Sequence, residues 1–149
     1  MAEIIDVAEA VLDRVGVITS WKLQKLCFYA QAWHLVWEDH CLFGSKFYAW
    51  PNGPVAPDLF RHHRGLFMVS PGFTGGDGTR LSTRESTSVD AVVQHYGAMD
   101  SVALTDLGHN ELWGITRTGL DPLEIGEVEI ATSAMADFYR ALSQRLVSV

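Results

Sequence analysis

The chain has 149 residues, of which 48% are hydrophobic and 19% are charged. This is the size of one ordinary domain with enough apolar side chains to bury a core, and the composition excludes intrinsic disorder. The formal net charge of −7 and the scattered Lys and Arg residues argue against nucleic-acid binding, because phosphate backbones repel an acidic surface.

The first two predicted elements are helices. Apolar residues recur at helical spacing from Ile4 to Val15, and Gly16 follows as a stop signal. Thr19 is suited to cap a second helix over about residues 20–39. That second helix is apolar on most of its circumference, so we expect other elements to pack around it.

The polar residues of this central helix fall within one narrow strip when they are placed at 100° per residue. We interpret the strip as a sliver of solvent-exposed surface, a hydrogen-bonded interior network, or a functional site. Its members are Gln24, Gln31, His34 and Glu38.

The middle of the chain alternates short elements with turns. Residues 46–50 are β-prone, and the Pro-Asn-Gly-Pro sequence at 51–54 is a strong turn signal. Pro57 opens a predicted short helix through residue 63. Residues 70–80 contain four glycines and a proline, which predicts a flexible loop.

The last third is predicted to be mainly helical. A capping-box spacing at 82–85 begins a helix that Gly97 ends, and Asp100 or Ser101 caps another short one. A further helical turn is expected around residues 112–113 and a strand over 127–130. The closing helix has one apolar face made of Met135, Phe138, Tyr139, Leu142 and Leu146.

These elements predict a single domain over residues 1–149. Its fold class is mainly α (α+β), with helices around a buried central helix and a small antiparallel β element formed between distant strands.

The sequence contains no signal for secretion or membrane insertion. Glu3, Asp6 and Glu9 interrupt the N-terminal segment, and the longest apolar stretch is too short to span a bilayer. Cys27 and Cys41 are expected to be free thiols. We therefore expect a cytoplasmic protein that does not bind membranes.

The strongest enzymatic hypothesis is a metal-dependent hydrolase. His34 and Glu38 have the i, i+4 spacing of two ligands on one helix face, and His40, Cys41, His62 and His63 could complete a site. However, the HExxH pattern and closely spaced Cys/His quartets are absent. We therefore predict no metal, no cofactor and no catalytic residues.

Three blocks of sequence resemble the Panacea domain, the family that includes SocA-like antitoxins and phage GepA-like proteins. Residues 22–35 read KLQKLCFYAQAWHL, and Leu42-Phe43 precedes FYAWPNGPV at 47–55. Residues 107–113 read LGHNELW, and a terminal helix follows. The resemblance covers nearly the whole chain.

The resemblance implies a function in binding. Such a protein would be the antitoxin of a toxin–antitoxin pair and would neutralise, by direct binding and occlusion, a protein toxin encoded nearby. SocA also delivers its toxin to a protease, so an adaptor role toward a protease is implied as well. A phage regulatory or adaptor protein is the remaining alternative.

We expect the residues of the family motif to be structural first, with Lys22, Gln24 and Gln31 tying the central helix to the strand turn. The partner surface is expected to use Trp50, Phe60 and Trp113 as anchors, since aromatic side chains dominate binding energy at interfaces. The motif residues are Lys22, Gln24, Lys25, Gln31, Trp33, His34, Trp50, Gly53, Pro54, His109 and Glu111.

Overall fold

A computed structural model describes residues 1–147 of the chain and the side chains through Arg145. The fold is mainly α (α+β), as predicted. Its helices are α1 (Ile4–Val15), α2 (Ser20–Glu38), α3 (Pro57–His63), α4 (Thr83–Tyr96), α5 (Ser101–His109), α6 (Leu112–Thr116) and α7 (Thr132–Val147). Its strands are β1 (Ile18–Thr19), β2 (Phe47–Trp50), β3 (Gly53–Val55), β4 (Met68–Val69) and β5 (Glu129–Ile130), and a 3₁₀ turn, η1, spans Gly78–Arg80.

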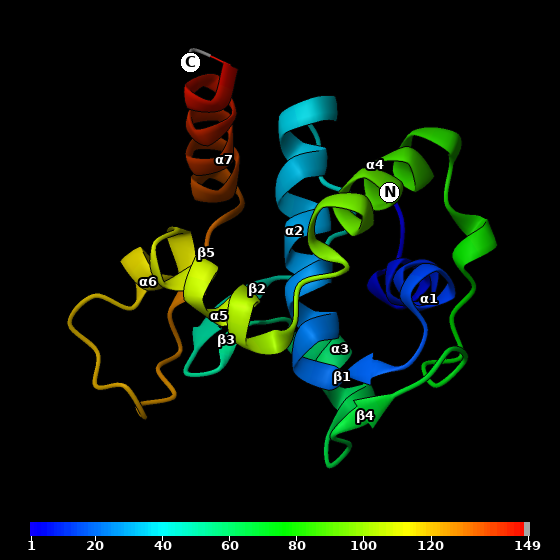
Figure 1. The fold of residues 1–149 in the computed structure, drawn as a ribbon, viewed down its shortest axis with the longest axis horizontal. Helices are drawn as coiled ribbons and strands as arrows, with labels where there is room; N and C mark the ends of the chain where they lie inside the picture. The colour runs from blue at the N-terminus through cyan, green and yellow to red at the C-terminus, as the bar shows by residue number, and fades with distance from the viewer. Residues whose placement is uncertain (148–149) are drawn as a thin grey trace.

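Helix α2 stands at the centre of the molecule, between α7 on one side and α1 and α4 on the other (Figure 1). The Thr19 hydroxyl accepts a hydrogen bond from the Lys22 N–H at 3.1 Å, which confirms the predicted cap. Every residue from Leu23 through Leu35 is buried. The apolar circumference of this helix therefore predicted its environment correctly.

The β element is antiparallel and joins distant parts of the chain. β2 lies between β3 and β5, with Tyr48 opposite Val55 and Phe47 opposite Ile130. The pairing of an early with a late strand was predicted, but β3 was not, because Gly53 and Pro54 read as turn residues. Proline is tolerated there since β3 is an edge strand, where a missing N–H costs no ladder hydrogen bond.

The glycine-rich segment 70–80 is held against α1, which corrects the expectation of a flexible loop. The Asp6 carboxylate accepts from the N–H of Asp77 at 2.8 Å. A Cβ atom added at Gly76 would lie 2.5 Å from the Ile5 carbonyl oxygen, and one at Gly78 would lie 2.8 Å from the Cα of Ala10. Glycine is required here because the two backbones touch.

The last helix covers α2 with the predicted apolar face. Met135 and Tyr139 are buried in the common core, and Phe138 and Leu142 pack against it half-buried. The side chain of Leu146, the fifth predicted member, lies outside the described side chains.

Candidate functional site

Two glutamines of α2 brace the chain on either side of the β2–β3 hairpin. Gln31 accepts from the N–H of Leu42 and donates to the carbonyl of Phe43, both at 2.7 Å. Gln24, two helical turns earlier on the same face, accepts from the Ala56 N–H at 2.9 Å and donates to its carbonyl at 3.2 Å. Both side chains are buried. This part of the polar strip is therefore the hydrogen-bonded interior network.

Two lysines of α2 fasten it to the neighbouring helices. Lys22 donates to the Gly97 carbonyl at 2.7 Å, at the C-terminal end of α4, where a positive charge is favourable. Lys25 donates to the Thr105 hydroxyl of α5 at 3.1 Å, and burial lowers the pKa of its ammonium group. Of the three residues expected to tie α2 to the strand turn, only Gln24 binds beside it. Lys22 lies on the side of α2 that faces α4, and the other glutamine reaches the loop before β2.

Glu111 joins three helices through a buried set of phenols. Its carboxylate accepts from the hydroxyls of Tyr29 at 3.0 Å and Tyr139 at 2.8 Å. Tyr29 stacks on Tyr96 with ring centroids 3.9 Å apart, and the indole of Trp33 donates to the Tyr96 hydroxyl at 2.9 Å. Burial raises the pKa of Glu111, and the hydrogen bonds from Tyr139 and Tyr29 oppose that shift. Burial also raises the pKa of Tyr96 to about 12.

A narrow crevice lies where these elements meet. It is lined by residues of all three sequence blocks, among them Lys25, Gly53, Pro54, Glu111 and Trp113. Side chains fill it so closely that its interior has room for about one water molecule. The structure therefore brings the motif residues together as a packed framework.

The three predicted anchor residues differ in exposure. Trp113 is buried, and its indole N–H donates to the Trp50 carbonyl at 2.7 Å. Trp50 and Phe60 are half-buried, with ring centroids 5.3 Å apart. Trp21, which the sequence did not single out, stacks on Phe60 at 6.5 Å. His109 is exposed, with its ring against Trp113.

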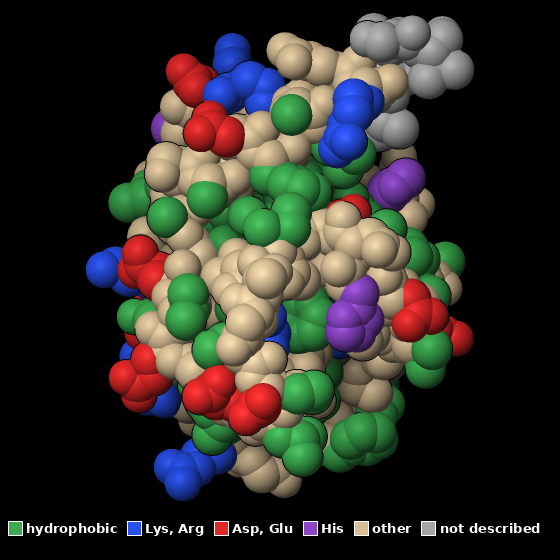
Figure 2. Space-filling model, turned by 90° about the vertical axis from the view of Figure 1, so that its left-hand side faces the viewer, with side chains coloured by type: hydrophobic (Ala, Val, Ile, Leu, Met, Phe, Trp, Pro, Cys, Tyr) green, Lys and Arg blue, Asp and Glu red, His purple; other side chains and the backbone are tan. Residues whose placement is uncertain are grey.

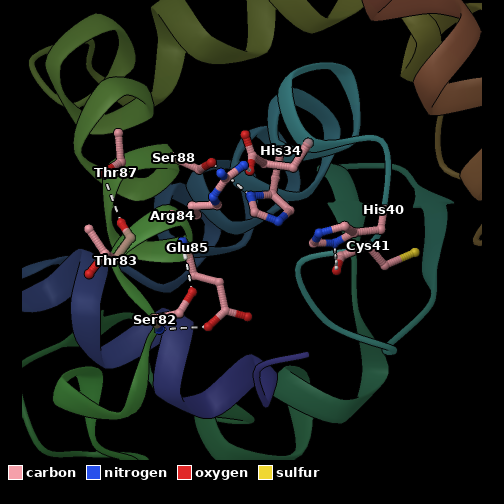
Figure 3. A network of polar contacts seen from close by, with 10 residues as sticks. His34, His40, Cys41, Ser82, Thr83, Arg84, Glu85, Thr87 and Ser88 are labelled. Carbon is pink, nitrogen blue, oxygen red and sulfur yellow. Dashed lines mark hydrogen bonds and ion pairs between the residues drawn. The ribbon is translucent and has the colours of Figure 1, made fainter.

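Of the residues in the hydrolase hypothesis, His34 and Glu38 lie on α2 and His40 and Cys41 follow it (Figure 3), whereas His62 and His63 lie on α3. The Nδ1 atom of His34 is 2.7 Å from the Ser88 hydroxyl, and Glu38 forms an ion pair with Arg84 at 2.9 Å. Within the part of the chain that the structure describes, the buried Nε2 atom of His34 has no hydrogen-bond partner, and the ring of His40 lies 5.1 Å away between centroids. Throughout residues 1–147, no group of three or more His, Cys, Asp or Glu side chains is placed to hold a metal ion.

Among the motif residues, Gly53 has a backbone conformation that requires glycine. Its φ is +131°, and a Cβ atom there would lie 2.9 Å from Cε of Lys25. We expect Gly53→Val to lower the unfolding free energy by about 1–3 kcal/mol, because it imposes a strained backbone angle above a buried side chain. Urea unfolding would measure the change. Gly44→Val is the control, because Gly44 lacks a positive φ and a Cβ there would meet only the Met1 side chain at 3.6 Å, so an equal loss at Gly44 would contradict this account.

Two buried histidines are expected to make the domain sensitive to acid. Burial lowers the pKa of His34, and it also lowers the pKa of His63, which lies beside Gln24. The unfolded chain therefore binds more protons below pH 6.5, so stability present above that pH is lost as the pH falls toward the folded-state pKa. Each histidine contributes a slope of up to about 1.4 kcal/mol per pH unit.

Urea unfolding at pH 7.5, 6.5 and 5.5 measures this slope. His63→Gln should flatten it, whereas the control His62→Gln, at the exposed neighbouring position, should not. Glu111 titrates in the opposite direction but is present in every protein compared, so it cancels. Equal slopes in wild type and His63→Gln would contradict the assignment.

The chain is similar to a known protein family. A family model described as "Antitoxin SocA-like, Panacea domain" matches residues 23–114, which is more than half of the chain. No curated protein and no solved structure matches it. Within residues 1–147, no helix has the length and apolar character needed to cross a membrane.

Proposed function

The chain belongs to the family of SocA-like antitoxins with a Panacea domain, and from this premise we propose that it neutralises a cognate protein toxin by binding and occluding it. The proposed toxin is encoded beside the chain's own gene. The chain acts in this proposal by binding rather than by catalysis.

The observation that carries the proposal is that polar motif residues form their hydrogen bonds within the domain. Gln24, Gln31 and Glu111 each bind groups of the domain itself, and the crevice between the motif blocks is filled by side chains. Such a framework supports a rigid domain that presents a surface to a protein. The half-buried Trp50 and Phe60 are the anchors we propose on that surface.

Co-expression tests the function directly. Induction of the neighbouring reading frame alone should arrest growth, and the chain supplied in trans should restore growth and co-purify with the toxic protein. If the chain restores growth without binding the toxic protein, occlusion is wrong. If it restores nothing, the antitoxin function is wrong.

The anchors are tested by Trp50→Ala and Phe60→Ala. Because both rings are only half-buried, we expect each variant to remain folded and to restore growth poorly. Circular dichroism establishes the fold, and co-purification reports binding. Full rescue by both folded variants would place the anchors elsewhere.

A further inference from the structure

The segment between α6 and β5 has a shape set from inside by Arg117. The buried guanidinium donates from Nη1 to the Ala49 carbonyl at 2.7 Å, and from Nη2 to the carbonyls of Glu124 at 2.7 Å and Asp121 at 2.9 Å. The planar guanidinium, with several donors in fixed directions, thus fastens the segment to β2 and to itself. Although residues 117–128 contain no helix or strand, their backbone is preorganised.

Three apolar side chains of this segment face outward. Leu123 is 89% exposed, Ile125 60% and Val128 39%. The segment extends away from the helices at the left of the molecule (Figure 1). Adjacent apolar side chains on a fixed backbone mark an interaction surface when they are left exposed in this way.

The charge around these side chains is mainly negative, although one carboxylate, that of Glu129, forms an ion pair with Lys46 at 3.3 Å. Residues 118–129 contain four acidic residues and no Lys or Arg, and all four, Asp121, Glu124, Glu127 and Glu129, are exposed. Figure 2 shows acidic and hydrophobic side chains side by side on the lower part of this face, with Lys and Arg mainly toward its edges. Such a surface repels nucleic acid, anionic lipid and a second copy of itself.

A second apolar surface lies near basic residues instead. Leu66 and Phe67 are exposed between α3 and β4, as is Met68 at the start of β4, but Arg61 and Arg64 lie close by in the chain. The two surfaces therefore suit partners of different charge. The acidic one also lies outside residues 23–114, the part matched by the family model, so it is a feature of this chain beyond the framework.

We propose that residues 118–129, here called the acidic loop, dock a basic region of the protein partner. Leu123 and Ile125 enter an apolar depression of that partner, and the surrounding carboxylates meet its Lys and Arg side chains. This inference rests on the proposed antitoxin function, since the partner is the toxin, and it adds the acidic loop to the surface at Trp50 and Phe60.

The test uses the full chain and two kinds of variant. Leu123→Ser/Ile125→Ser removes the apolar contacts, and we expect it to weaken binding of the toxin by about 30-fold or more. Glu124→Lys/Glu127→Lys reverses charge, and we expect it to slow association about tenfold at low salt, with a smaller effect at high salt. The controls are Val102→Ser and Phe67→Ser, at positions that are 70% and 71% exposed elsewhere, and both should bind as the wild type does.

A second probe makes the result independent of the toxin. A short labelled amphipathic peptide of Lys and Leu should bind the wild type and both controls, and should bind both acidic-loop variants at least about tenfold more weakly. Melting temperatures confirm that each variant is folded.

The outcomes separate the two proposals. If the wild type neutralises the toxin and the folded acidic-loop variants do so equally well, the acidic loop is not the docking surface and the antitoxin function stands. If the chain neutralises no protein encoded beside it but binding of the peptide depends on the acidic loop, the docking surface exists and the antitoxin function is wrong. Equal peptide binding by all variants overturns the inference in either case.

Discussion

Replacing Trp113 with Ala is expected to cost about 3–5 kcal/mol of unfolding free energy, because it empties a large volume in the core. The indole is 6% exposed and lies against the ring of His109. It also donates to the Trp50 carbonyl at 2.7 Å, so the variant leaves that acceptor without its donor. Domains of this size are stable by about 5–15 kcal/mol in total. The loss is therefore a large share of the total stability, and we expect Trp113→Ala to restore growth less well than the wild type because less of it is folded.

Urea unfolding followed by circular dichroism measures the loss. Trp113→Phe should recover much of the packing but not the hydrogen bond, and so should fall between the alanine variant and the wild type. Trp50→Ala, at a half-buried position, should cost less than Trp113→Ala. A Trp113→Ala variant within about 1 kcal/mol of the wild type would contradict a core role for this residue.

Local signals in the sequence predicted the local structure well. Thr19, Ser82 and Asp100 each cap a helix with the side chain, as their positions before apolar periodic segments indicated. The buried character of α2 followed from its apolar circumference. These features depend on residues within one or two helical turns, which is the range over which sequence patterns are informative.

Features that depend on distant contacts were not predicted. Strand β3 forms at residues that read as a turn, because β2 is available to pair with them. Glu111 and Tyr139 are 28 residues apart, and no spacing rule connects them. Arg117 was not singled out, since an isolated arginine in the sequence gives no sign that it will be surrounded by backbone carbonyls. The motif resemblance identified the framework residues but not their partners.

In the polar strip of α2, helical spacing predicted the position of the residues but not their distant hydrogen-bond partners. Helical spacing correctly placed Gln24, Gln31 and His34 on one face, and all three are buried. Spacing alone left three interpretations open. The partners decided between them: backbone groups of the segments around the β2–β3 hairpin for the glutamines, and Ser88 of α4 for His34.

Replacing Glu9 with Ala is expected to cost about 3 kcal/mol or more, because it removes the acceptor on which the segment 70–80 depends. One carboxylate oxygen accepts from the Gly72 N–H at 2.5 Å, and the other from the N–H of Thr74 at 3.1 Å and its hydroxyl at 2.5 Å. Glu9 and Thr74 are buried. The alanine variant leaves the N–H and the hydroxyl of Thr74 without this acceptor in a buried place, and each such donor costs about 1–3 kcal/mol. Asp13→Ala, at an exposed position on the same helix, is the control and should change stability by less than about 0.5 kcal/mol.

Urea unfolding gives both values, and hydrogen exchange at Gly72 and Thr74 locates the effect. Protection at these amides should fall in Glu9→Ala and stay unchanged in Asp13→Ala. If Glu9→Ala retains both protection and stability, segment 70–80 is held by Asp6 and by the close contacts at Gly76 and Gly78, and the role assigned to Glu9 is wrong.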